Sequence, residues 1–259
     1  MIICTSRKFI FVHVNKTAGT SITEALAPRL QWNDIVLGAT PIGQALDQPF
    51  KDRFNLYKHS TAREIRDVVG AEVWSDSTTF AVVRDPVDRT VSLYRYLKRI
   101  ETAASPLRRL RRRLSGRQPV WNGLGALRES RSFSDFIRHP ILRHEPGFMP
   151  QHAFLSGENG EIIVDRLLRF EAIAEDFEAL CRELGFGTLR IGHENRSGRD
   201  GGRPPVPDSD IDFLRDYYAK DYALLASLID RRERMTSGPR PDGTSAGSEA
   251  GTRGRRATR

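Results

Sequence analysis

The 259-residue chain contains only two cysteines, Cys4 and Cys181, and no apolar run near the roughly 20 residues of a membrane span. Two isolated cysteines form neither a disulfide framework nor the paired spacing of a zinc site. The first residues, MIICTSRKF, lack the charged-then-apolar order of a secretory signal, and no internal repeat is present. We therefore expect a reduced, cytoplasmic protein without a metal centre.

The net charge of +8 is concentrated in two segments. Residues 99–117 hold seven arginines against one glutamate, and the tail from Arg231 holds eight arginines against three acidic residues, which leaves the rest slightly acidic. A nucleic-acid partner is therefore unlikely. The tail, residues 235–259, is rich in Gly, Ser, Thr and Pro without apolar periodicity, which predicts disorder.

Strand-like and helix-like segments alternate along residues 1–234. This alternation predicts a single P-loop-like α/β domain, with a central, mostly parallel sheet flanked by helices. In such folds a ligand binds at the carboxyl ends of the strands.

The first candidate binding segment follows a β-branched and aromatic run, residues 9–14, which predicts a buried strand. A small, hydroxyl-rich turn comes next, and residues 20–26 predict a helix. The free amides and the positive dipole end of such a helix favour an anion, and Lys16 adds a positive charge. Lys16 precedes Gly19 by three positions and no GxxxxGK[ST] string occurs, so we expect one phosphate group rather than a polyphosphate. The same pattern also fits a tight turn with no ligand.

A second candidate segment begins with another predicted strand, residues 78–83, which ends at Arg84-Asp85-Pro86. Pro86 suits the first turn of a helix, predicted over residues 87–100. Arg84 at the strand end and Ser92 two turns into the helix can converge on one phosphate. Arg89 is open to two interpretations, a solvated helix arginine or a functional one.

Taken together and in this order, the two segments resemble the sulfotransferases that use 3′-phosphoadenosine-5′-phosphosulfate (PAPS). The turn resembles their PKTGGTS-type loop, from which Asn15 and Ala18 depart, and VRDPVDRTVSLY resembles their VRxPxxRxxSxY motif. The resemblance implies that the first loop holds the 5′ phosphosulfate and that Arg84 and Ser92 hold the 3′ phosphate. The absence of a membrane anchor suggests a bacterial-type member of the glycan O-sulfotransferase-like branch.

His59 lies between the two segments, just before a helix that Thr61 and Glu64 predict as a capping box starting at Ala62. We expect this helix to bury Ile65, Val68 and Val69. Sulfuryl transfer to an alcohol needs a base, and histidine titrates in a suitable range. The position of His59 resembles the catalytic-base region of the glycan branch, although a loop hydrogen bond alone would also explain it. We interpret His13, which lies within a strand, as structural.

The resemblance extends to about residue 230. Residues 149–155 resemble the family's PQ-x-x-FL segment, residues 162–170 predict one or two strands, and a helix is predicted to stop at Gly185. His193 to Ser197 resembles a His-x-Asn-x-Ser string near the nucleotide, which implies that Arg196 and Ser197 contact the 3′ phosphate or the adenine. One long final helix is predicted over residues 208–231.

Residues 99–131 form a basic, arginine-rich insert within the domain. Leu107, Leu110 and Leu114 predict a short helix with a leucine side and an arginine side. Such a helix is a solvated surface element, a platform for an anionic acceptor, or a contact with an acidic membrane surface. Trp74 and Trp121 are candidates for stacking on sugar rings.

We therefore expect an enzyme that moves the sulfuryl group of PAPS to a hydroxyl of a carbohydrate or glycolipid, either neutral or anionic, with Lys16 and His59 as catalytic residues. The alternatives are a non-catalytic, arginine-rich binding protein and a nucleotide-dependent, kinase-like phosphotransferase. The expected cofactor-binding residues are Lys16, Thr17, Ala18, Gly19, Thr20, Ser21, Arg84, Ser92, Arg196 and Ser197.

Overall fold

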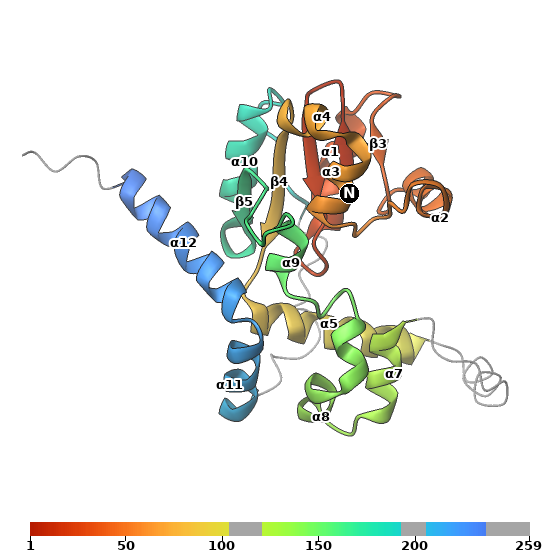
Figure 1. The fold of residues 1–259 in the computed structure, drawn as a ribbon, viewed down its shortest axis with the longest axis vertical. Helices are drawn as coiled ribbons and strands as arrows, with labels where there is room; N and C mark the ends of the chain where they lie inside the picture. The colour runs from red at the N-terminus through yellow and green to blue at the C-terminus, as the bar shows by residue number, and fades with distance from the viewer. Residues whose placement is uncertain (104–120, 193–205, 237–259) are drawn as a thin grey trace, which may run out of the picture.

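A five-stranded sheet is the centre of the fold in the computed structural model, which describes residues 1–103, 121–192 and 206–236 (Figure 1). Its order is β3-β1-β2-β4-β5. Strands β2 to β5 run in one direction, and β1 runs antiparallel between β3 and β2. The predicted α/β class with a mostly parallel sheet is therefore confirmed. The strands are β1 (Ile2–Cys4), β2 (Phe9–Val12), β3 (Ile35–Val36), β4 (Thr78–Val83) and β5 (Arg166–Arg169).

Helices cover both faces of this sheet because alternate strand residues point to opposite sides. One face packs against α3 (Ala62–Val69) and α9 (Gln151–Leu155), with α2 (Pro41–Phe54), α4 (Ala71–Ser75) and α12 (Ala219–Thr236) at its margin. The other face packs against α1 (Gly19–Leu26) and α10 (Ile173–Glu183). The short 3₁₀ segments η1 (Ala27–Arg29) and η3 (Phe170–Ala172) extend these connections.

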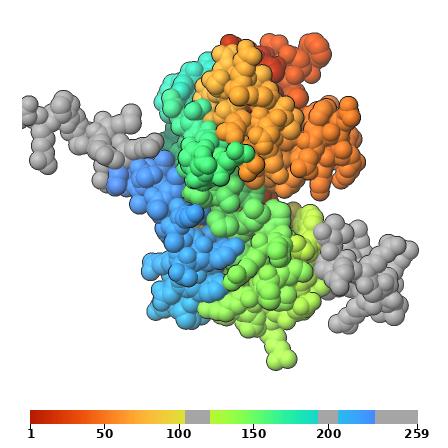
Figure 2. Space-filling view, viewed as in Figure 1, coloured from red at the N-terminus to blue at the C-terminus, as the bar shows by residue number. Residues whose placement is uncertain are grey.

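A second, all-helical core adjoins the sheet. It joins α5 (Pro86–Ala103), α7 (Asn122–Glu129), α8 (Phe133–Arg138), η2 (Pro140–His144) and α11 (Asp208–Tyr217). Figure 2 shows this helical part at the opposite end of the molecule from the sheet. Helix α5 begins at the sheet, shortly after β4, and runs into the helical part (Figure 1). It therefore links the sheet to the helical core.

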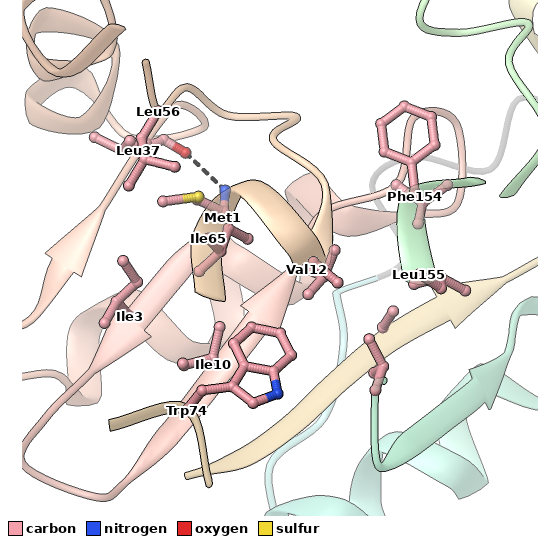
Figure 3. Packing of buried hydrophobic residues seen from close by; sticks show 14 of the residues in the cluster. Met1, Ile3, Ile10, Val12, Leu37, Leu56, Ile65, Trp74, Phe154 and Leu155 are labelled. Atoms are coloured by element: carbon pink, nitrogen blue, oxygen red, sulfur yellow. Dashed lines mark hydrogen bonds between the residues drawn. The ribbon is translucent and has the colours of Figure 1, made fainter. Parts of the chain in front are cut away.

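The α3 face of the sheet shows how Trp74 is used. Its side chain is 9% exposed and packs with Ile10 and Val12 in the apolar cluster of Figure 3. Trp74 is therefore a core residue, and the prediction that it stacks on a sugar ring is wrong. In the same cluster the amine of Met1 donates to the carbonyl of Leu37 over 3.0 Å.

The structure differs from the sequence-based expectations at three places. The strand predicted over residues 9–14 is β2, and it ends at Val12 rather than Val14 because the chain turns there into the loop that precedes α1. Val68 is 43% exposed, since α3 is short and buries only a narrow stripe that includes Ala62 and Ile65. The predicted final helix is divided at Tyr218, whose buried hydroxyl donates to the carbonyl of Phe148 over 2.6 Å.

Candidate functional site

Both candidate segments leave the sheet at the same edge. Strands β2 and β4 are parallel neighbours, with Val12 opposite Ala81, so the residues that follow each strand emerge side by side. A hydrogen bond joins them directly: Nη1 of Arg84 donates to the carbonyl of Lys16 over 3.3 Å. The sequence-predicted lysine loop and arginine segment are therefore parts of one site.

The loop before α1 has an unusual backbone. Lys16 and Ala18 have φ values of 66° and 65°, the left-handed region that costs a residue with a Cβ about 1 kcal/mol or more. Ala18 provides no side-chain cap, and the first helical hydrogen bond runs from Ile22 to the carbonyl of Ala18. The amides of Gly19 and Thr20 therefore have no acceptor within the described residues, which leaves them available to an anion.

Gly19 is required by its contact with His13. A Cβ on Gly19 would lie 2.1 Å from Cδ2 and Nε2 of the His13 ring. The imidazole is buried, stacks on Phe11 and contacts the ring of His59 edge-on at 4.7 Å between centroids. Burial lowers the pKa of His13 well below its usual range, so this ring is neutral. The buried His13 ring thus packs against Gly19 and supports the loop, in keeping with a structural role.

Thr17 contributes less than its residue type suggests. Its hydroxyl is fully buried and donates to the carbonyl of Val14 over 2.9 Å, which closes the turn. The Thr17 hydroxyl is therefore engaged within the protein, and its backbone amide is what remains for binding. Thr20 is partly exposed and is the hydroxyl that other site residues approach.

Lys16 lies in a positively charged and partly desolvated environment. Burial and, to a smaller extent, repulsion from Arg99, Arg84 and Lys58 together lower its pKa to about 8. Its ammonium lies 4.1 Å from the ring centroid of Tyr96 on α5, a cation–π contact. A lysine that lies near other cations and contacts the ring of Tyr96 is well placed to receive an anion.

Lys58 is a site residue that the sequence analysis did not single out. Its Nζ lies 3.4 Å from the hydroxyl of Thr20, and its stem covers Gly38, where an added Cβ would lie 2.4 Å from Cδ of Lys58. Its backbone amide donates to Asp47 over 2.6 Å, and its carbonyl accepts from the amine of Met1 over 3.1 Å. In the sequence, the only indication of this role is that Lys58 directly precedes the candidate base His59. The fold is what shows that the Lys58 side chain reaches the loop before α1.

His59 is held in a defined tautomer. Its Nδ1 lies 2.9 Å from the carbonyl of His13, and because a carbonyl only accepts, Nδ1 carries the proton. The lone pair is therefore on Nε2. The pKa of His59 is lowered to about 3, chiefly by burial and also by the charges of Lys58 and Lys16, although the bond to His13 acts in the opposite direction. The capping box of Thr61 and Glu64 that fixes the following helix is confirmed.

Arg84 is fixed on both sides. Its guanidinium carbon lies 4.0 Å from the ring centroid of Phe170, and its Nε is buried with no partner among the described residues. Its peptide pairs with Gln151, as the side-chain oxygen of Gln151 accepts from the Arg84 amide over 2.9 Å and the side-chain nitrogen donates to the Arg84 carbonyl over 2.7 Å. An orphaned donor on a fixed guanidinium suits a phosphate.

Asp221 holds Gln151 in turn. The carboxylate of Asp221, 1% exposed, accepts from the amides of Gln151 and His152 over 2.9 and 2.8 Å. The PQ-x-x-FL segment thus has a structural explanation, because it carries the glutamine that fixes the Arg84 peptide. No local pattern pointed to Asp221, which lies 70 positions from Gln151.

Ser92 lies on α5 four residues before Tyr96, and residues four apart share a helix face. Since the Tyr96 ring contacts Lys16, Ser92 lies on the side of α5 that faces the loop. Arg89 points elsewhere. It is fully buried, donates to the carbonyls of Gly147 and Met149, and fits neither of the two interpretations that the sequence left open. It anchors the segment that precedes Gln151.

Some expectations concern residues beyond those that the structure describes. These are Arg196, Ser197, the helix expected over residues 107–114, and the tail from residue 237 onward. Within the described ranges there is no group of three or more His, Cys, Asp or Glu side chains that could hold a metal ion. No helix in those ranges is both long and apolar enough to span a bilayer.

The described residues fit a donor with phosphates at two positions. Lys16, Lys58 and the amides of Gly19 and Thr20 surround one anion position, and Arg84 with its unpartnered Nε marks a second. The sequence model of the sulfotransferase family matches residues 1–226. No curated protein and no solved structure matches the chain.

Proposed function

The chain belongs to the sulfotransferase family, and on that premise we propose that it transfers the sulfuryl group of PAPS to a hydroxyl of a carbohydrate or glycolipid. The observation that carries the proposal is the bond between Arg84 and Lys16, because it brings the two phosphate-binding segments into one site. PAPS would supply the activated sulfuryl group, and the side chains of the site would position it and manage the charge and the proton.

Binding would divide between the two loops. The amides of Gly19 and Thr20, the hydroxyls of Thr20 and Ser21, and the ammonium groups of Lys16 and Lys58 would hold the 5′ phosphosulfate. Arg84 and Ser92 would hold the 3′ phosphate. Arg84 suits this role because its stacking on Phe170 and its paired peptide leave the guanidinium little freedom to lose on binding.

His59 would act as the general base. Its Nδ1 proton is committed to the carbonyl of His13, so Nε2 can accept the proton of the acceptor hydroxyl as that oxygen bonds to sulfur. With a pKa of about 3 the imidazole is neutral at pH 7 but only weakly basic, and the negative charge of bound PAPS would raise this pKa toward the range in which histidine acts as a base. Lys16 would stabilise the negative charge left on the phosphate oxygen as the bond to sulfur breaks, a preorganised electrostatic role.

Calorimetric titration with 3′-phosphoadenosine-5′-phosphate (PAP), AMP and ATP tests the donor. We expect micromolar binding of PAP that weakens by at least about tenfold when the 3′ phosphate is absent or when Arg84→Ala is used. Arg29→Ala, which changes an exposed arginine at the end of η1, is the matched control. Equal binding of ATP and PAP, or an Arg84→Ala protein that binds PAP as the wild type does, would contradict the proposal.

A further inference from the structure

Two aromatic side chains form a pair beside Lys16. The rings of Tyr96, on α5, and Trp121, directly before α7, lie with centroids 6.2 Å apart and planes inclined by 21°. Trp121 is 43% exposed, whereas Trp74 is a core residue and Trp121 contributes to none of the three apolar cores. An exposed tryptophan in a stacked pair provides a large apolar surface to a ligand, at a small cost in side-chain entropy.

The backbone below this pair is fixed. The carbonyl of Trp121 accepts from the amides of Leu124 and Gly125, and the Gly123 amide donates to the buried Glu145 carboxylate over 2.8 Å. Gly123 allows a close approach, because a Cβ there would lie 2.8 Å from Leu97 of α5. Helix α7 therefore packs on α5 (Figure 1). This packing limits the movement of Trp121 relative to Tyr96.

The pair also adjoins the expected reaction centre. The ammonium of Lys16 lies 4.1 Å from the Tyr96 centroid, and the guanidinium carbon of Arg99 lies 5.7 Å from the same ring. Arg99 is exposed, one turn beyond Tyr96 on α5. An acceptor on this surface would lie next to Lys16, with a cation beside it.

We propose that Tyr96 and Trp121 form the acceptor subsite, on which a pyranose ring packs its apolar face while a carboxylate on the sugar reaches Arg99. This inference rests on the proposed function and specifies the acceptor side of the same site. The aromatic surface accounts for the ring, because C–H-rich faces bury apolar area against it. The cation accounts for the acidic substituent, because carboxylate and guanidinium pair by charge-assisted hydrogen bonds.

Titration of the full chain with two oligosaccharides tests the subsite. The probes are a galacturonic acid hexamer and neutral maltohexaose, each with and without saturating PAP. We expect the acidic hexamer to bind better, and Trp121→Ala and Tyr96→Ala each to weaken its binding at least about tenfold. Trp121→Phe should retain most of the affinity because a ring remains. Arg99→Gln should remove the preference for the acidic probe.

Trp32→Ala is the matched control, because Trp32 is 96% exposed and lies away from the proposed subsite. Asp34, close to Trp32 in the chain, binds Ser6 in the turn between β1 and β2, at the opposite end of β2 from the Lys16 loop. The affinity of the Trp32→Ala protein should equal that of the wild type. Unchanged sugar binding in Trp121→Ala, or no binding of either probe, would overturn the subsite while PAP binding still supported the donor site. Sugar binding that depends on Trp121 in a protein that does not bind PAP would support the subsite and overturn the donor assignment.

Discussion

Gln151 and the peptide of Arg84 pair through two hydrogen bonds of 2.9 and 2.7 Å, one in each direction. The Gln151 side chain is itself held by a buried carboxylate, so the pairing is rigid. Gln151 thereby fixes the backbone of Arg84, and with it the position from which the Arg84 side chain extends.

Replacing Gln151 should therefore weaken recognition of the 3′ phosphate specifically. We expect Gln151→Ala to lower the affinity for PAP about tenfold, because Arg84 loses its fixed origin, and to leave the weaker AMP affinity nearly unchanged. Calorimetric titration with both nucleotides measures the two effects. Gln48→Ala, an exposed glutamine on α2, is the control. An equal loss for PAP and AMP would indicate general unfolding instead.

Gly19→Ala should disrupt the loop, since its Cβ would lie 2.1 Å from the His13 ring. Relieving such a contact shifts buried groups and typically costs about 1–3 kcal/mol. We expect a lower melting temperature and loss of PAP binding. Gly192→Ala, where an added Cβ meets nothing within 4 Å, should behave as wild type. If the clash is the cause, His13→Ala in the same chain should restore part of the stability.

Ala18→Gly should stabilise the protein, because Ala18 has a φ of 65° and glycine adopts this region without the Cβ penalty. The expected gain is about 0.5–1 kcal/mol after the larger chain entropy of glycine is subtracted. Thermal unfolding measures it. Ala27→Gly is the opposite control, because Ala27 has right-handed helical angles and should lose stability. A loss of stability in Ala18→Gly would contradict the strain argument.

Donor affinity should decrease as pH rises through the pKa of Lys16, about 8. Lys16 is charged below this pH and neutral above it, so the attraction to an anion is present at pH 7 and reduced at pH 9. Titrations with PAP from pH 6.5 to 9.5 measure the change. Lys16→Arg should flatten the profile, since arginine stays charged. A flat wild-type profile would show that Lys16 does not bear on donor binding.

His59→Ala should reduce turnover about 10²–10⁴-fold, the usual contribution of a general base, with little change in PAP affinity. Transfer of the radiolabelled sulfuryl group from PAPS to an acceptor measures turnover, and calorimetry measures PAP binding. His144→Ala, an exposed histidine in η2, is the control. Wild-type turnover in His59→Ala would remove this residue from the mechanism.

The local parts of the fold were predictable from the sequence. Two strand–turn–helix segments and the capping box of Thr61 depend on neighbouring residues, and all three are observed. The short strands β1 and β3, three and two residues long, carry too little periodicity to be recognised alone. They become strands because β1 pairs with both β2 and β3.

The parts of the site that depend on distant contacts were not predictable. Arg89 has the sequence context of a surface helix arginine, yet it is fully buried against carbonyls about 60 residues away. Lys58 reaches Thr20 only because the fold brings residues 38 positions apart together. The roles of Gln151 and Asp221 require the end of a strand and two helices, from three regions of the chain.

The attachment of Gln151 to Asp221 has a consequence for biosynthesis. Every described residue expected to touch the donor has left the ribosome once Ser92 has emerged, but the Arg84 peptide acquires its partner only with Gln151. That partner is secured only when Asp221 of α12 packs against α9. A nascent or truncated chain that stops before Asp221 would contain the donor-contacting residues and still be poor at selecting the donor, so competence is delayed until α12 has been synthesised and has packed against α9.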